Sequence, residues 1–134
     1  MKKIRIGKDI VIEWAVLTNG EKISLEGRDL KLVLISPLGR KTVLPLTVSG
    51  NVLHSRVNGV DQHYLGKYRL TLWENFGKIN QSAVDECNAY QLVATSCEEA
   101  ISDIGLASAI LNLSTDTNVE IYFEVVKNTN EINI

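Results

Sequence analysis

The chain has 134 residues, of which 45% are hydrophobic and 22% charged, and its formal net charge is −2. This length suits one domain with a single core, and this composition excludes wholesale disorder. The nearly balanced charge supplies no basic field, which argues against partners such as nucleic acid or an anionic membrane surface.

The first residues carry charges where a secretory signal needs an apolar stretch. Apolar runs such as residues 32–35 are far too short to span a bilayer. We therefore expect synthesis in the cytoplasm, without a cleaved signal peptide and without a membrane partner.

Apolar residues in the first half of the chain recur with period two, which is typical of half-buried strands. Trp14 lies on the apolar face of the first such segment and is predicted to be the centre of the core. Pro45 cannot donate a ladder hydrogen bond, so its segment is expected at a sheet edge. The spacing of short strands and single glycines predicts a sandwich or barrel and leaves no room for β-α-β units. The expected strands are residues 10–16, 23–25, 30–36, 41–48 and 52–57.

A Gly-x-Tyr sequence enters the next strand directly after the polar loop 58–63. Tyr68, Leu70 and Leu72 share one face of this strand. The arrangement resembles the tyrosine corner of immunoglobulin-like folds, in which the phenol closes a crossover by hydrogen-bonding to nearby backbone. The other interpretation is a core tyrosine at the start of an ordinary strand.

The last third of the chain has a less regular pattern. A returning strand is expected at residues 85–95, with Cys87 and Tyr90 on opposite sides. A short helical excursion is predicted near residues 98–112, because Ile101, Ile104 and Leu111 fall near helical spacing. A further strand is expected at residues 118–125. The prediction is thus one all-β, immunoglobulin-like antiparallel β-sandwich over residues 1–126, followed by a polar tail or linker at 127–134.

Cys87 and Cys97 are the two cysteines of the chain. They form a disulfide if their strands lie side by side, and otherwise they are two reduced, partly buried thiols. The sequence leaves both alternatives open.

The residues that usually carry chemistry form no recognisable site, so no catalytic, cofactor-binding or metal-binding residue is assigned and the chain is predicted not to be an enzyme. His54 and His63 stand outside any metal-ligand spacing. The trio at residues 61–63 lies in a polar loop, which favours a solvated loop over a site fragment. The serines lack a nucleophile-elbow context, and the acidic residues are scattered.

Four residues form a candidate interaction surface. Trp73 faces away from the apolar side of its strand, and it is either exposed or packed beneath a loop or a second sheet. If exposed beside Arg69 and Lys67, it would suit a protein interface or a sugar platform. Tyr90 is the second aromatic residue that a sugar platform would use.

Several short motifs appear in an order that is similar to a family of phage and prophage tail proteins. They resemble the immunoglobulin-like N-terminal domains of baseplate upper proteins and tail-fibre attachment modules, including those from gut Bacteroides, over residues 1–97. The motifs are residues 4–10, 14–16, 26–30, 49–53, Gly59, 61–62, 66–70 and 85–87.

The resemblance implies a structural virion component that anchors a fibre or receptor-binding module to a baseplate. Its expected partners are other tail or baseplate proteins and further copies of itself, and it implies no catalytic residue. Two alternatives stay open: a carbohydrate-binding or adhesin-type β-sandwich that uses Trp73 and Tyr90, and an enzyme on a β-sandwich, because fold alone does not decide function.

Overall fold

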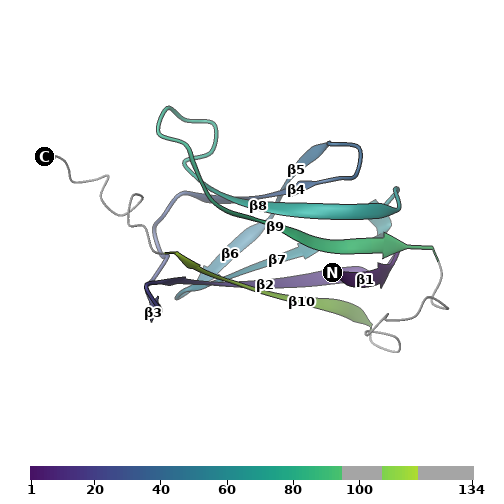
Figure 1. Cartoon of the computed structure of the whole chain (residues 1–134), viewed down its shortest axis with the longest axis horizontal. Helices are drawn as coiled ribbons and strands as arrows, with labels where there is room; N and C mark the ends of the chain where they lie inside the picture. Colours follow the sequence, from purple (N-terminus) through teal and green to yellow (C-terminus); the bar gives the residue numbers. More distant parts are fainter. Residues whose placement is uncertain (95–106, 118–134) are drawn as a thin grey trace, which may run out of the picture.

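The computed structural model describes residues 1–94 and 107–117 as two packed β-sheets (Figure 1). One sheet has the strand order β1-β9-β8-β4-β5, and the other has the order β10-β2-β7-β6, with the short β3 beside β2. The all-β sandwich is therefore confirmed, whereas the immunoglobulin-like topology stays a prediction. The elements are β1 (Lys2–Arg5), β2 (Asp9–Thr18), β3 (Glu21–Lys22), β4 (Leu30–Ile35), β5 (Lys41–Leu44), β6 (Leu46–Ser49), β7 (Val52–Val57), the 3-10 turn η1 (Gly59–Asp61), β8 (Gly66–Glu74), β9 (Ser82–Val93) and β10 (Ser108–Thr117).

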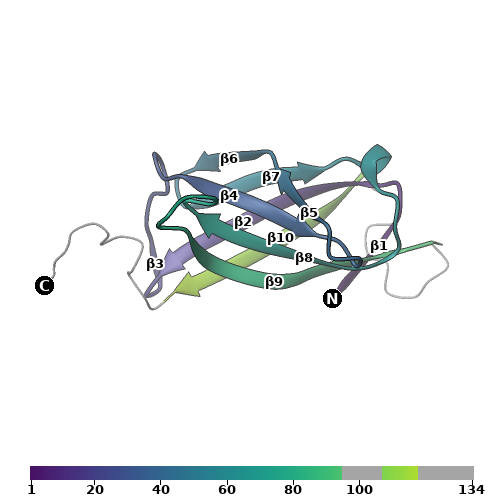
Figure 2. The same ribbon diagram turned by 90° about the horizontal axis from the view of Figure 1, so that it is seen from above.

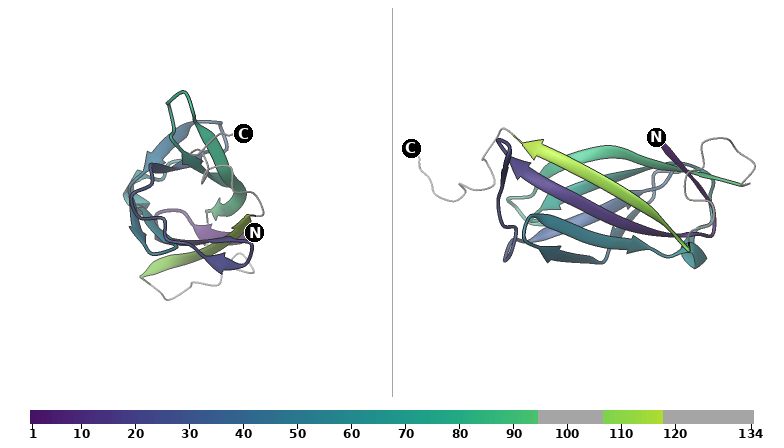
Figure 3. Two further views of the ribbon diagram at one scale, coloured as in Figure 1. Left: turned by 90° about the vertical axis from the view of Figure 1, so that its left-hand side faces the viewer. Right: turned by 90° about the horizontal axis from the view of Figure 1, so that it is seen from below.

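The core lies between the two sheets, which are seen end-on in Figure 3 (left). Trp14 is 1% exposed, which confirms its predicted place in the core. Its indole Nε1 donates to Thr115 Oγ1 at 2.7 Å, and Thr115 donates in turn to Asp85 Oδ2 at 2.6 Å. Because Thr115 belongs to one sheet and Asp85 to the other, this chain of hydrogen bonds joins the sheets and gives the indole N–H the partner that burial requires.

Two strand pairs are parallel, so the sandwich is not purely antiparallel as predicted. β1 runs parallel to β9, and β10 runs parallel to β2 (Figure 3, right). A side-chain hydrogen bond also links the edge strands β1 and β10, because Lys2 Nζ donates to the carbonyl oxygen of Ile110 at 2.7 Å.

The single strand predicted at residues 41–48 is instead two strands in different sheets. β5 pairs with β4, and β6 pairs with β7, so the chain passes from one sheet to the other at Pro45. The missing N–H of proline breaks the ladder there. The Pro45 carbonyl oxygen accepts a 2.5 Å hydrogen bond from Ser55 Oγ. Both strands lie at sheet edges, as the proline suggested.

The helical excursion predicted near residues 98–112 is wrong where it overlaps β10. Ser108 to Asn112 are hydrogen-bonded in register with β2, and Ala109 and Leu111 are buried in the core. Ala109 and Leu111 are two residues apart and share the buried face of a strand, so the period-two pattern describes this segment and the helical spacing of Leu111 does not. Residues 98–106, the strand expected at 118–125, the tail at 127–134 and Cys97 lie outside the described residues.

The sides predicted for Cys87 and Tyr90 were also wrong. Tyr68 pairs with Tyr90 while Arg69 pairs with Asn88, so Ala89 is an extra residue in β9. Such a bulge switches the face to which the following residues point. Consequently Cys87 and Tyr90 both pack against the core.

Candidate functional site

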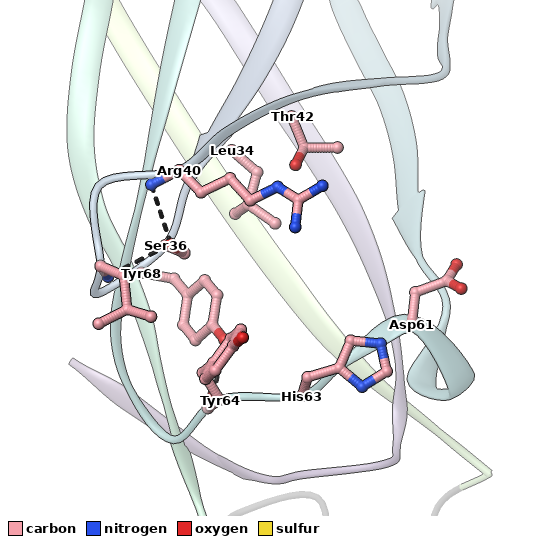
Figure 4. Close-up of a pocket in the computed structure, with 9 residues that line it drawn as sticks. Leu34, Ser36, Arg40, Thr42, Asp61, His63, Tyr64 and Tyr68 are labelled. Carbon is pink, nitrogen blue, oxygen red and sulfur yellow. Dashed lines mark hydrogen bonds between the residues drawn. The ribbon is translucent and has the colours of Figure 1, made fainter.

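A cavity of about 390 Å³ lies between the β4–β5 hairpin and the segment that connects β7 to β8 (Figure 4). Figure 2 shows that these two segments lie at the same end of the sandwich. Its volume falls within the range of about 300–1,000 Å³ that is usual for small-ligand sites. The lining residues are Leu34, Ser36, Leu38, Arg40, Thr42, Asp61, His63, Tyr64 and Tyr68.

The hairpin wall of the cavity is held by a tight three-residue turn. The Gly39 amide donates to the Ser36 carbonyl at 2.9 Å, and Gly39 adopts a φ of 86°, where a side chain would be strained. The Ser36 hydroxyl accepts hydrogen bonds from the amides of Leu38 at 3.3 Å and Arg40 at 3.1 Å. The turn residues therefore fix the position from which Arg40 enters the cavity.

The opposite wall is clamped to the turn between β1 and β2. Gln62 Oε1 accepts from the Gly7 amide at 2.6 Å, and its Nε2 donates to the Lys8 carbonyl at 2.9 Å. Asp9 Oδ1 accepts from the Gly59 amide at 2.7 Å. This amide, followed by the Arg56 guanidinium, holds the pKa of the Asp9 carboxyl below its usual range. Several hydrogen bonds thus immobilise the start of the connecting segment.

Tyr68 fixes the end of the same segment. Its hydroxyl donates to the Tyr64 carbonyl at 2.5 Å, which is the backbone bond expected of a tyrosine corner. The Tyr68 ring is buried and stacks on Tyr90, with a centroid separation of 5.1 Å and an interplanar angle of 9°. Burial also raises the pKa of Tyr68, so the hydroxyl stays a donor at neutral pH.

Replacing Tyr68 with phenylalanine removes this bond and leaves the ring stacking in place. We expect the free energy of unfolding to fall by about 1 kcal/mol, because the Tyr64 carbonyl loses its donor. Urea unfolding followed by tryptophan fluorescence measures the change. Tyr64→Phe is the matched control, since it removes an equivalent hydroxyl but keeps the carbonyl; equal stabilities of the two variants would contradict the structural role of the bond.

The polar side chains that face the cavity come from both walls. Figure 4 shows Arg40 and Thr42 on the hairpin side and Asp61, His63 and Tyr64 across from them. Within the described part of the chain, the side chains of Arg40, Asp61 and His63 make no hydrogen bond or ion pair. They therefore present unused donors and acceptors to a ligand.

Sequence reasoning treated residues 61–63 as a solvated loop. Asp61 and His63 are exposed, as expected, but they line the cavity, and Gln62 is a structural clamp. Arg40 and Tyr64 were missed because nothing in the sequence indicates that the β4–β5 turn lies opposite this loop. The one local feature of the sequence that could have pointed to the cavity is the polar loop at residues 58–63, directly before the Gly-x-Tyr sequence.

Three of the four residues of the predicted interaction surface share one face of β8. Arg69 and Lys67 are exposed, and Trp73 is half-buried, tilted against Phe76 with ring centroids 5.4 Å apart. Trp73 is thus partly covered. Tyr90 is 0% exposed and points into the core, so its assignment to this surface was wrong. The bulge at Ala89, which a period-two pattern does not reveal, turns it inward.

Other reactive groups in the described residues are few. Cys87 is a half-buried free thiol, and burial raises its pKa to about 11, which keeps it protonated and unreactive at neutral pH. Among residues 1–94 and 107–117, no group of three or more His, Cys, Asp or Glu side chains is placed to hold a metal ion. The same residues contain no helix with the length and apolar character needed to cross a membrane.

Comparisons with protein-family models, curated proteins and solved structures give no match. The functional interpretation therefore rests on the residues and geometry described above and on the resemblance in the sequence.

Proposed function

We propose that the chain is a non-catalytic structural component of a phage or prophage tail, which anchors a fibre or receptor-binding module to the baseplate. The observation that supports this role best is the open side of the sandwich, formed by β5 and β6. The sequence resemblance over residues 1–97 supplies the identity of the assembly.

β5 and β6 each pair with a single neighbour within the described residues, so each leaves one edge of backbone amides and carbonyls without a strand beside it. An edge of this kind is a template for pairing with another chain. β1 and β10 also end their sheets, and on their side of the sandwich the Lys2–Ile110 hydrogen bond links the two sheets. A neighbouring subunit that adds a strand to β5 or β6 would extend a sheet of this domain, which is a simple way to join virion proteins.

The strand order also supports the immunoglobulin-like part of the proposal. β4, β8 and β9 lie in the order of strands C, F and G, and β2, β7 and β6 lie in the order of strands B, E and D. The place beside strand B is taken by β10, which runs parallel to it. This departure leaves the rest of the order intact.

Detection in particles tests the proposed role directly. We expect the chain to co-purify with the tail or baseplate fraction of particles induced from the bacterium that encodes it, and its gene to lie beside genes for tail or tape-measure proteins. Mass spectrometry of purified particles is the measurement. Particles that contain the other tail proteins but lack this chain would overturn the proposal.

A charge on β5 tests the proposed pairing edge. Val43 is 50% exposed on this strand, and Val43→Lys should dissociate a self-assembled form, because charged edge residues oppose strand pairing. Sedimentation equilibrium over a range of protein concentrations measures the assembly state. Val60→Lys is the matched control, since Val60 is 86% exposed but lies in η1, outside any strand. A wild-type chain that sediments as a monomer at every concentration would refute self-assembly through this edge.

A further inference from the structure

The cavity between the β4–β5 hairpin and residues 58–65 has walls that are fixed before any ligand arrives. The Ser36 turn holds one wall, and the Gln62 clamp and the Tyr68 hydroxyl hold the other. Preorganised walls reduce the ordering cost that binding would otherwise incur. This arrangement distinguishes the cavity from a gap between mobile loops.

The apolar part of the cavity offers a surface for the C–H face of a ring. Leu34 and Tyr68 are buried beside it, and Leu38 and Tyr64 are 72% and 49% exposed. The Tyr64 ring meets His63 edge to face at a centroid separation of 6.5 Å. A half-exposed tyrosine provides a flat apolar surface together with a polar hydroxyl.

The polar part contains both donors and acceptors. Arg40 can only donate, the Asp61 carboxylate can only accept, and the Thr42 hydroxyl and the His63 imidazole can do both. A ligand that carries several hydroxyl groups, each a donor and an acceptor, matches this mixture. A ligand with acceptors alone, such as sulfate, does not.

The charged residues that line the cavity also favour a neutral ligand. Arg40 is the one cation and Asp61 the one anion among the lining residues when His63 is neutral. Because these charges cancel, the cavity attracts neither anions nor cations as a class. From its volume, its half-exposed aromatic ring, its mixed hydrogen-bonding groups and its zero net charge, we propose that this cavity binds a neutral sugar unit of a glycan. The inference rests on the cavity and does not depend on the proposed role in a phage tail.

Titration of the ¹⁵N-labelled chain with single sugars tests the proposal. The probes are glucose, galactose, mannose and N-acetylglucosamine, with glucuronic acid as a charged analogue. We expect saturable amide shifts, for at least one neutral sugar, confined to residues 36–42 and 61–65, and weaker binding of glucuronic acid. No saturable shift with any neutral sugar, shifts centred on Trp73, or tighter binding of glucuronic acid would each overturn it.

Matched variants assign the binding to named groups. Asp61→Asn and Tyr64→Ala should each weaken binding of the responding sugar about tenfold, the effect expected for losing a charge-assisted hydrogen bond or a stacking face. Glu21→Gln, in β3 at the other end of the sandwich, is the control and should bind as the wild type does. Tyr64→Ala keeps the backbone carbonyl to which the Tyr68 hydroxyl donates. If the spectrum of Tyr64→Ala nevertheless shows unfolding, Arg40→Met takes the place of Tyr64→Ala as the second variant. The site would be refuted if Asp61→Asn bound the sugar with unchanged affinity and the second variant, Tyr64→Ala or its replacement Arg40→Met, did so too.

Discussion

Replacing Glu74 alone with leucine should lower the free energy of unfolding by about 3 kcal/mol, since the largely buried Arg28 guanidinium loses the carboxylate that accepts its hydrogen bonds. Glu74 ends β8, and its carboxylate accepts from Arg28 Nε at 2.8 Å and from one terminal nitrogen at 2.6 Å. The two side chains are only 15% and 9% exposed. Val16, Leu25 and Leu72 lie around the pair, so little water is available to solvate the guanidinium once the carboxylate is gone.

Two further variants separate the cost of a buried guanidinium that has lost its carboxylate from the cost of losing the pair. The double variant Arg28→Met with Glu74→Leu should recover most of the lost stability, because well-packed apolar residues often replace a buried ion pair at little cost. Arg69→Gln breaks the ion pair between Arg69 and Glu86, whose two side chains are exposed by 46% and 47%, respectively. This exposed pair contributes little, so the free energy of unfolding should change by less than about 1 kcal/mol. Urea unfolding of all three measures these differences. A double variant no more stable than Glu74→Leu would show that the guanidinium without its carboxylate is not the cause of the lost stability.

Replacing Gly59 with alanine should lower the free energy of unfolding by about 3 kcal/mol, at the upper end of what overpacking usually costs. An added Cβ would lie 2.0 Å from the Gly7 carbonyl oxygen and 3.0 Å from the Lys8 nitrogen. Both atoms belong to the backbone, so the clash can be relieved only by moving η1 away from the β1–β2 turn. That movement would also lengthen the hydrogen bonds of Gln62 to Gly7 and Lys8 and of the Gly59 amide to Asp9, and it would open one wall of the cavity.

Gly77→Ala is the control for Gly59→Ala. Gly77 has a φ of 80° and open space around its Cα, so alanine there adds backbone strain without a clash. We expect a loss of about 1 kcal/mol for this change, by urea unfolding under the same conditions. Amide exchange at Gly7 should accelerate in Gly59→Ala but not in Gly77→Ala. Equal losses in both variants would show that the close approach of Gly59 to Gly7 does not matter.

The sequence predicted those parts of the fold in which a local pattern decides which face is buried. Alternation placed Trp14 in the core and put Tyr68 and Trp73 on opposite faces of β8. The Gly-x-Tyr sequence offered the bond from Tyr68 to nearby backbone as one of two interpretations, and the structure shows that bond to the Tyr64 carbonyl. In each case the chemistry lies within a few residues of the chain, so period and turn residues were sufficient.

Other features depend on partners that are distant in the sequence. β10 was missed because its strand character comes from pairing with β2, about a hundred residues earlier in the chain. The inward turn of Tyr90 depends on one extra residue in β9 relative to β8. The crossing at Pro45 depends on which sheet receives each half of the segment.

The sequence by itself indicated the all-β fold and the core position of Trp14, because burial of one strand face imposes a local period. It offered the tyrosine corner as one of two interpretations of Tyr68. The tertiary structure alone decided which strands form the sheet edges and that Arg40 lies across a cavity from Asp61 and His63. Those relations arise when strands far apart in the chain are brought together, and no local pattern encodes such a distance. The identity of the assembly stays a proposal that rests on resemblance, and the sugar site one that rests on geometry.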